Sequence, residues 1–483
     1  MKVLQNLEPA SVFHYFEEIC AIPHTSFHEK ELSNYCVAFA KEHNLAYEQD
    51  DLGNILMIVP ATSGYEEVAP IILQGHLDMV GDKLSDCPLD LEKDGIEVVL
   101  DGDFVHANGT TLGADNGIAV AYALAIADAA DIPHPRLEIV LTVSEEVGLI
   151  GATAMDLSSC QARRMLNIDS EAEGILTAGC AGGMRAGSFI PVERVMKKGY
   201  DCTLTLTGFL GGHSGIDINR GRANAITAMG RVLSTISRTV SFGIMEMNGG
   251  SKENVIAKES KAALVVPADQ IDAMKTAVAD MQKQFSSEFG TSDPDIQLIF
   301  EVDDSEEEIE LVLSGNSQER VLAALNLIPN GVQSMCADLP TLVETSLNTG
   351  VLSLKEEELE LGTSIRSSVS SAKTALAQKV EQLVHMLGGT VEFTGEYPAW
   401  PYARHSELRD LCIRVYKEQY GKEPEVELLH AGLECGLFSD KIPGLDCISF
   451  GPNLYDVHTP KEKMSISSVQ RVWEYIKAIL AAK

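Results

Sequence analysis

Basic residues are scarce in this sequence, and their scarcity limits the partners it can have. The 483 residues include 37 Lys and Arg against 71 Asp and Glu, which gives a formal net charge of -34. Proteins that bind nucleic acids or anionic membranes use Lys and Arg to neutralise phosphate groups. We therefore expect neither a nucleic acid nor a membrane surface among the partners of this chain.

Paired cysteines and long hydrophobic runs are also missing. The ten cysteines are scattered without a Cys-x-x-Cys pair, which favours reduced thiols over a disulfide framework. The most apolar stretch, residues 118–127, is too short to cross a bilayer, and residues 1–18 lack the apolar core of a signal peptide. These absences predict a soluble protein located in the cytoplasm.

The order of strand-like and helix-like segments predicts two domains, since the chain is too long for a single hydrophobic core. Residues 1–185 and 395–483 alternate between the two kinds of segment, which predicts an α/β domain whose central mixed sheet is flanked by helices. Residues 186–394 predict an inserted α+β lid domain, for which we consider a construction from two related ferredoxin-like halves. Within it we expect a helix over residues 372–387, with Ser371 as its N-cap and Gly388 just past its end.

Acids and histidines follow the predicted strands of the α/β domain, where ligand sites of such sheets lie. They are His76 and Asp78 after the run 68–74, Glu145 and Glu146 after 137–143, and Asp169 after 165–168. Asp115 precedes an apolar helix in Gly113-Ala114-Asp115-Asn116-Gly117, and His458 lies in Val457-His458-Thr459-Pro460. Two imidazoles and several carboxylates in one cleft would bind two divalent metal ions and leave a carboxylate for proton transfer.

Each member of this set also has a purely structural interpretation. His76 and Asp78 point to the same side of a strand, so Asp78 could orient the imidazole or simply close the strand. Asp115 could bridge two metals or cap a helix. One of Glu145 and Glu146 could bind metal while the other moves a proton, or both could be solvated loop acids. It is the joint occurrence of five such strand-end features that favours a metal site.

Longer motifs in this sequence resemble those of bacterial aminoacyl-histidine (Xaa-His) dipeptidases, which belong to the dizinc exopeptidases together with aminoacylase and carnosinase. The motifs are Ile22-Pro23-His24, Gln74-Gly75-His76-Leu77-Asp78-Met79-Val80, Thr110-Thr111-Leu112-Gly113-Ala114-Asp115-Asn116-Gly117 and His430-Ala431-Gly432-Leu433-Glu434-Cys435-Gly436-Leu437-Phe438. The resemblance extends over essentially the whole chain. It implies a zinc-exopeptidase-like catalytic domain with an inserted lid.

The resemblance also implies roles for the metal-site residues. One zinc would be held by His76, Asp115 and Asp169, and the other by Asp115, Glu146 and His458. Asp78 would orient His76, and Glu145 would be the general base and acid. Zn²⁺ is the expected metal, while Co²⁺ and Mn²⁺ accept the same mixed nitrogen and oxygen donors.

In the lid, the resemblance implies substrate-binding residues. His213, in Leu210-Gly211-Gly212-His213-Ser214-Gly215, would stabilise the oxyanion of the tetrahedral intermediate. Asn254 and Arg366 would bind the free C-terminal carboxylate of the substrate, and Gly432 would add backbone contacts. Without the resemblance, Arg366 could be an ordinary surface ion pair, and His213 and Asn254 could be turn residues. A homodimer in which His213 serves the partner subunit is an open alternative.

The function expected from the sequence is metal-dependent hydrolysis of unblocked dipeptides, of the Xaa-His or carnosine type. The attacking group would be a water between the two metals, whose proton Glu145 accepts and passes to the leaving amine. Two alternatives remain open. The same metal site could serve an N-acyl amino-acid deacylase, or the chain could be a catalytically silent metal-dependent binding protein.

Overall fold

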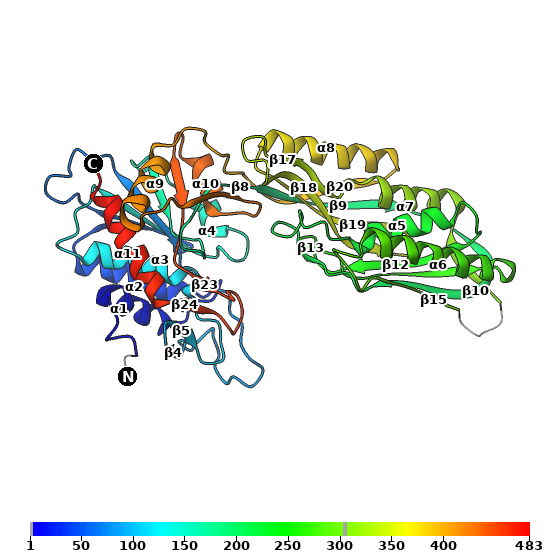
Figure 1. Cartoon of the computed structure of the whole chain (residues 1–483), viewed down its shortest axis with the longest axis horizontal. Helices are drawn as coiled ribbons and strands as arrows, with labels where there is room; N and C mark the ends of the chain where they lie inside the picture. Colours follow the sequence, from blue (N-terminus) through cyan, green and yellow to red (C-terminus); the bar gives the residue numbers. More distant parts are fainter. Residues whose placement is uncertain (1–2, 303–306) are drawn as a thin grey trace. The chain divides into compact units, whose positions relative to one another are not determined.

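The computed structural model describes residues 3–302 and 307–483, which fold into two compact units (Figure 1). The first unit comprises Met1–Cys180, Trp400–Leu428 and Leu433–Lys483, and the second comprises Ala181–Ala399 and Leu429–Gly432. Each unit has a hydrophobic core of its own. The second unit is therefore an insertion into the first along the sequence.

The first unit is built around an eight-stranded sheet in the order β1-β2-β6-β3-β7-β22-β8-β21. Its strands are β1 (Ala46–Gln49), β2 (Ile55–Val59), β3 (Ile71–His76), β6 (Leu137–Thr142), β7 (Arg164–Asn167), β8 (Ile175–Cys180), β21 (Glu425–Leu429) and β22 (Asp446–Ser449). The central strands β6, β3, β7 and β22 run parallel, whereas β1, β2 and β8 pair antiparallel. Every residue of β3 and β6 is buried, as expected for strands covered on both faces.

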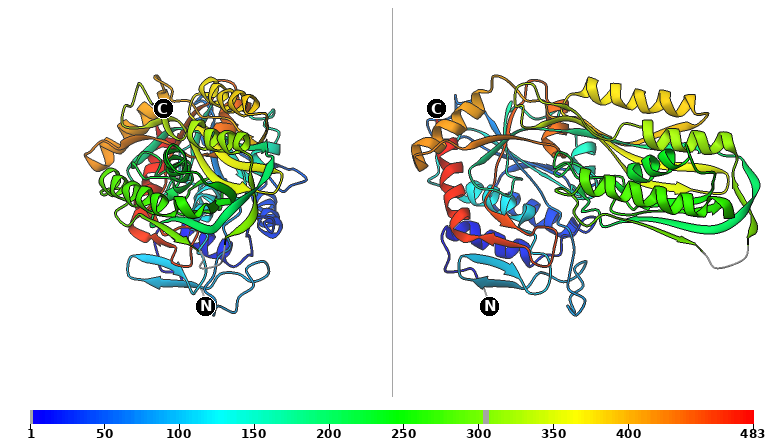
Figure 2. Two further views of the ribbon diagram at one scale, coloured as in Figure 1. Left: turned by 90° about the vertical axis from the view of Figure 1, so that its right-hand side faces the viewer. Right: turned by 45° about the vertical axis from the view of Figure 1, so that its right-hand side comes forward.

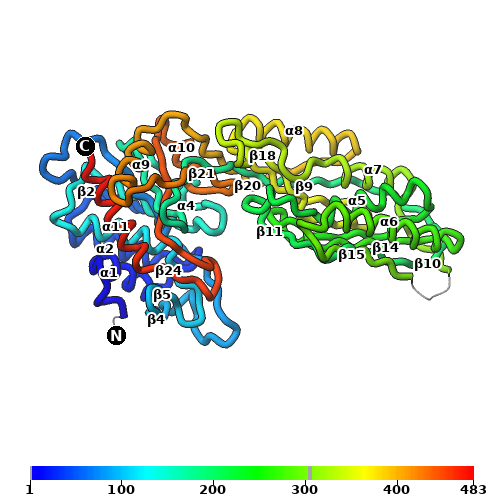
Figure 3. Tube along the Cα trace, viewed as in Figure 1, coloured from blue at the N-terminus to red at the C-terminus, as the bar shows by residue number. Residues whose placement is uncertain are grey.

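Seven helices of the described chain belong to the first unit. They are α1 (Ala10–Cys20), α2 (Lys30–Glu42), α3 (Ala114–Asp128), α4 (Ile150–Ala154), α9 (Glu407–Tyr420), α10 (Glu434–Lys441) and α11 (Ile466–Ala481). The helices α1 and α11 come from opposite ends of the chain and contribute to the same core (Figure 3). Tyr122 of the buried helix α3 stacks on Trp473 of α11, with ring centroids 6.1 Å apart.

A small four-stranded sheet completes the first unit. Its order is β23-β24-β5-β4, from β4 (Val98–Asp101), β5 (Phe104–Ala107), β23 (Leu454–Tyr455) and β24 (Lys463–Ser465). Because β23 and β24 flank the segment 456–462, this sheet fixes both ends of the loop that carries His458.

The second unit is built on a ten-stranded antiparallel sheet. Its strands are β9 (Gly182–Pro191), β10 (Arg194–Thr207), β12 (Gly243–Gly250), β14 (Ser260–Val266), β15 (Gln297–Val302), β16 (Glu308–Leu313), β17 (Gly331–Met335), β18 (Val343–Leu354), β19 (Glu358–Ser367) and β20 (Thr390–Tyr397). A separate ribbon pairs β11 (Gly212–His213) with β13 (Val255–Ile256). The helices, which pack on one face of the sheet (Figure 2), are α5 (Ala225–Ile236), the short 3-10 helix η1 (Ala268–Gln270), α6 (Ile271–Glu288), α7 (Gly315–Leu327) and α8 (Ser370–Met386).

The sheet order of the second unit reveals two halves of the same topology. The first half follows β10-α5-β12-β14-α6-β15, and the second follows β9-α7-β18-β19-α8-β20. When the four strands of each half are numbered 1 to 4 along the chain, both halves have the order 4-1-3-2 in the sheet. This order corresponds to β15-β10-β14-β12 in the first half and to β20-β9-β19-β18 in the second. The two halves meet where β12 pairs with β18. This order is the ferredoxin-like arrangement expected from the sequence.

The helix predicted over residues 372–387 exists, but its start was predicted wrongly. Helix α8 begins at Ser370, its N-cap is Val369, and no side chain caps it. Ser371 therefore lies inside the first turn rather than at the cap. Gly388 does follow the end of the helix, in the left-handed region with φ 78°. Among the described residues, no helix combines the length and apolarity needed to span a bilayer.

Candidate functional site

The predicted metal-site residues of the first unit converge at the carboxyl ends of three neighbouring parallel strands. His76 is the last residue of β3, and β3 pairs with β6 on one side and β7 on the other. Glu145 and Glu146 follow β6, and Asp169 follows β7. Because these strands are parallel and adjacent, the polar residues after them meet at one edge of the sheet.

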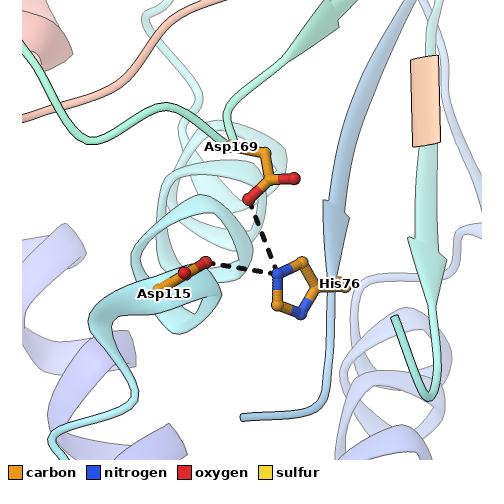
Figure 4. A group of neighbouring side chains, drawn as sticks. All are labelled: His76, Asp115 and Asp169. Atoms are coloured by element: carbon orange, nitrogen blue, oxygen red, sulfur yellow. Dashed lines mark hydrogen bonds and ion pairs between the residues drawn. The ribbon is translucent and has the colours of Figure 1, made fainter. Parts of the chain in front are cut away.

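His76 lies at the centre of this cluster, 1% exposed, and the carboxylates of Asp115 and Asp169 face the same nitrogen of its ring (Figure 4). Its Nε2 atom lies 3.3 Å from Asp115 Oδ1 and 3.5 Å from Asp169 Oδ1. Burial opposes the charged imidazolium, but the carboxylates of Asp115, Asp169 and Asp78 outweigh it and raise the pKa of His76 well above its usual range. The same negative surroundings would attract a cation.

Asp78 holds the other edge of the His76 ring. The Nδ1 atom of His76 lies 2.9 Å from the backbone oxygen of Asp78 and 3.4 Å from its carboxylate. The carboxylate of Asp78 also accepts the backbone N–H groups of Glu145, at 2.8 Å, and Glu146, at 3.2 Å. Asp78 thereby ties the end of β3 to the two glutamates that follow β6.

Asp115 bridges the two histidines of the cluster. Its Oδ1 faces His76, and its Oδ2 lies 3.2 Å from His458 Nε2. It is not the helix cap that was the alternative interpretation, because the N-cap of α3 is Gly113 and the backbone of Asp115 is not helical. Burial would raise the pKa of Asp115, but hydrogen bonds from His458 and His76 lower it well below its usual range.

His458 approaches Asp115 from the loop between β23 and β24. Its Nε2 atom lies 2.8 Å from Glu146 Oε1, and its backbone occupies the left-handed region with φ 63°. Hydrogen bonds to Asp115 and Glu146 raise the pKa of His458 to about 11. Although His458 is far from His76 along the chain, both imidazoles face the same aspartate.

Three overlapping groups of side chains in the first unit could each hold a metal ion. The first group is His76, Asp115 and Asp169, the second is His76, Glu145 and Glu146, and the third is Asp115, Glu146 and His458. In each group, the ligand atoms, one from each residue, all lie within 4.8 Å of one another. The first and third share Asp115 and have the composition expected from the sequence. Imidazole nitrogen and carboxylate oxygen donors with these spacings fit a pair of divalent ions of the zinc type.

The turn that carries Glu145 depends on a residue that the sequence did not single out. Glu29, 5% exposed, accepts both the backbone N–H and the hydroxyl of Ser144 at 2.8 Å through the same oxygen. Ser144 is held in the left-handed region at φ 51°. Burial raises the pKa of the neighbouring Glu145 well above its usual range. Nothing in the spacing of Glu29 along the chain indicated this contact.

Glu462 is a second residue that sequence reasoning missed. Its carboxylate, 2% exposed, accepts the backbone N–H groups of four consecutive residues at the start of α3. Leu112 and Gly113 donate to Oε2 at 2.7 and 3.0 Å, and Ala114 and Asp115 donate to Oε1 at 2.9 and 3.4 Å. Glu462 therefore performs the capping that Asp115 could have performed, and leaves the Asp115 side chain to face the histidines.

A third missed residue lies beneath the metal cluster. Glu434 is fully buried and accepts hydrogen bonds from Gln74 of β3 and from Thr142 of β6, the latter at 2.7 Å. Gln74 in turn accepts from Asn167 of β7. Burial raises the pKa of Glu434 to about 8. The motif 430–438 pointed to this segment but assigned no role to the glutamate.

The second unit contains the remaining predicted residues, His213, Asn254, Arg366 and Gly432. The Nδ1 atom of His213 accepts backbone N–H groups from Gly215, at 3.2 Å, and Ile216, at 3.3 Å. Burial, followed by the charge of Arg366, lowers the pKa of His213. The ring of His213 is therefore neutral, and its Nε2 atom carries the proton.

Three of these residues are tied into the local structure of the second unit. The backbone oxygen of Asn254 accepts the N–H of Ser214 at 2.9 Å, next to His213. Arg366, on β19, is 8% exposed and is therefore not a surface ion pair. Gly432 faces the ring of Tyr397, where a Cβ atom would come within 2.8 Å of it.

Fold and sequence together identify the class of protein. The family model of "Peptidase family M20/M25/M40" matches residues 72–482, and the chain belongs to this family. It is 37% identical over 482 residues, 99% of each chain, to the cytosol non-specific dipeptidase of Escherichia coli (strain K12).

Solved structures of peptidases are similar to this chain. The chain matches the crystal structure of aminoacylhistidine dipeptidase from Vibrio alginolyticus with a TM-score of 0.92 and 36% identity, over 99% of this chain and 97% of that chain. Aminopeptidase PepT from Bacillus cereus shares the fold, with a TM-score of 0.57 and 15% identity over 98% of each chain. The resemblance stated from the sequence motifs and the predicted fold class are both confirmed.

Proposed function

We propose that the chain is a metal-dependent dipeptidase that hydrolyses unblocked dipeptides, Xaa-His dipeptides among them. The observation that carries the proposal is the pair of ligand groups joined by Asp115, set in a chain of the M20 family. Its relatives are named a non-specific dipeptidase and an aminoacylhistidine dipeptidase. These names support small peptides as substrates and favour a dipeptidase over an N-acyl amino-acid deacylase or a silent binding protein.

In this proposal, His76, Asp115 and Asp169 hold one divalent ion, and Asp115, Glu146 and His458 hold the other. Zn²⁺ is the proposed metal, and Co²⁺ or Mn²⁺ would fit the same donors. When bound, the ions lower the pKa of a water molecule and polarise the peptide carbonyl.

The protein groups do the rest of the chemistry. Glu145 accepts the proton of the attacking water and donates it to the amine that leaves. Asp78 supports metal binding by His76 and proton transfer by Glu145, because it contacts the ring of His76 and the backbone N–H of Glu145 at the same time. Glu29 supports Glu145 from the other side through Ser144.

We propose that the second unit is the lid that supplies substrate contacts. The protonated Nε2 of His213 would donate to the developing oxyanion. Arg366 and Asn254 would bind the substrate's free C-terminal carboxylate, which a guanidinium can pair with bidentately. Gly432 would add backbone contacts to the substrate, and its lack of a side chain leaves room for the ring of Tyr397. The cytosolic relative supports a cytoplasmic location for this chemistry.

The proposal is tested by a substrate panel with the purified chain. β-Ala-His, Leu-Gly and N-acetyl amino acids are each incubated with and without a chelator, and the metal content is measured in parallel. Chelator-sensitive cleavage of the dipeptides is expected. Preferential cleavage of the N-acetyl amino acids would instead identify a deacylase, and metal binding without any hydrolysis would identify a binding protein.

A further inference from the structure

A row of four residues crosses the sheet of the second unit at the position of Arg366. Ser346 on β18 pairs with Arg366 on β19, Arg366 pairs with Gly183 on β9, and Gly183 pairs with Tyr397 on β20. Residues paired directly across neighbouring strands present their side chains on the same face of a sheet. Arg366 and Tyr397 are therefore on one face, two strands apart, with only a glycine between them.

The glycine is what allows the two side chains to meet. Arg366 donates from Nη1 to the hydroxyl oxygen of Tyr397 at 3.0 Å. A Cβ atom on Gly183 would come within 2.5 Å of the Tyr397 ring, and one on Gly432 within 2.8 Å. Cβ atoms essentially never approach other atoms this closely, so any side chain at Gly183 would displace the ring. The ring of Tyr397 thus lies in a slot formed by two glycines.

The backbone of Tyr397 is fixed as well. Lys373, a residue of α8 that is only 2% exposed, donates from Nζ to the backbone oxygen of Tyr397 at 2.8 Å. A buried ammonium group is costly unless its protons are bonded, so this contact is part of the packed structure. Both the ring and the main chain of Tyr397 are therefore held in place before any ligand arrives.

Arg366 itself is incompletely satisfied. Its Nε atom is buried and has no hydrogen-bond partner. Among the described residues, no carboxylate lies within ion-pair distance of its guanidinium. A buried, unpaired guanidinium is unfavourable, which implies that an anion completes the site. Since Nη1 is engaged by Tyr397, Nε and Nη2 are the guanidinium nitrogens that remain without a partner among the described residues.

We propose that Tyr397 is a positioning residue: it holds the guanidinium of Arg366 so that the Nε edge faces the substrate's C-terminal carboxylate. This inference rests on the proposed function, in which Arg366 binds that carboxylate. It explains why glycine stands at both positions 183 and 432, where a larger residue would push the phenol ring away from Arg366. The hydroxyl of Tyr397 acts through Arg366 and does not itself touch the reacting atoms.

The test compares the variant Tyr397→Phe with the wild type on two substrates, Leu-Gly and Leu-Gly amide. The amide lacks the carboxylate that Arg366 would bind. We expect KM for Leu-Gly to rise about three- to tenfold, which is the net contribution of a typical hydrogen bond, with kcat little changed. KM for Leu-Gly amide should change less than about twofold. The same hydroxyl deletion at Tyr65, which donates to the backbone oxygen of Ala481 at 2.8 Å, is the matched control.

Two further variants make the result decisive. In an Arg366→Ala background, Tyr397→Phe should have no additional effect on KM, because the residue it positions is gone. Gly183→Ala should reproduce the Tyr397→Phe defect by displacing the ring. Equal effects of Tyr397→Phe on both substrates, or additivity with Arg366→Ala, would overturn the inference and leave the dipeptidase proposal intact. A wild-type protein that cleaves no dipeptide would instead refute the proposed function itself.

Discussion

Replacing Glu462 with glutamine should destabilise the first unit severely, because glutamine keeps the shape of the side chain but has only one acceptor oxygen. Four backbone N–H groups, from Leu112, Gly113, Ala114 and Asp115, now share two carboxylate oxygens. In Glu462→Gln, two of the four lose their acceptor and face an amide N–H instead. A hydrogen bond to a charged group contributes about 1.5–3 kcal/mol, so the loss is about 3–6 kcal/mol. That is a large share of the roughly 5–15 kcal/mol by which proteins are typically stable.

Urea unfolding followed by tryptophan fluorescence measures this loss selectively. The only two tryptophans in the sequence, Trp400 and Trp473, both belong to the first unit. Glu474→Gln is the matched control, because the Glu474 side chain is 60% exposed and should contribute less than about 0.5 kcal/mol. If Glu462→Gln unfolds at the same urea concentration as Glu474→Gln, then the carboxylate is not what supports the backbone at the start of α3.

Three further outcomes are expected. His76→Ala should lose bound metal, measured by elemental analysis, as well as activity. Glu145→Gln should keep its metal and lose about a hundredfold or more in kcat. Full turnover by Glu145→Gln would show that Glu145 is not the general base. Glu29→Ala, which removes the oxygen that accepts both bonds from Ser144, should lower kcat about tenfold with KM and metal content unchanged. An unchanged kcat would contradict this role. Burial and the charge of Arg366 lower the pKa of His430 in the folded chain to about 3. In the unfolded chain the pKa of a histidine is about 6.5. Below that pH the unfolded chain therefore binds a proton at His430 that the folded chain does not bind. As the pH falls, the unfolding free energy of the wild type should therefore decrease more steeply than that of His430→Asn, by up to about 1.4 kcal/mol per pH unit. Unfolding followed by circular dichroism at several pH values measures the difference, and parallel curves of unfolding free energy against pH would refute the prediction.

The sequence made the metal site predictable because the cluster is built from strand ends. The apolar runs that end near His76, Glu145 and Asp169 mark buried parallel strands, and the carboxyl ends of such strands meet at one edge. The two ferredoxin-like halves of the second unit were visible for a similar reason, since the order of strands and helices survives in hydrophobic periodicity.

The supporting residues could not be found this way. Glu29, Glu434 and Glu462 act through tertiary contacts with segments far away in the sequence, and their neighbours give no periodic signal. Asp115 remained ambiguous because its two possible roles need the same residue type, and the choice was made by Glu462. The cap of α8 was placed wrongly because serine is a common N-cap, whereas the helix starts at Ser370 without any side-chain cap.

The nested topology of the second unit has a consequence for synthesis on the ribosome. Strand β9 emerges first but pairs with β19 and β20, so it must wait while the entire first ferredoxin-like half is translated. Within that half, from β10 to β15, β14 pairs with both β10 and β12, and β15 pairs with β10, so these four strands form a sheet without β9. Since a nascent chain folds as soon as its contacts are complete, the middle of this protein should be the earliest part to become protease-resistant, ahead of both ends.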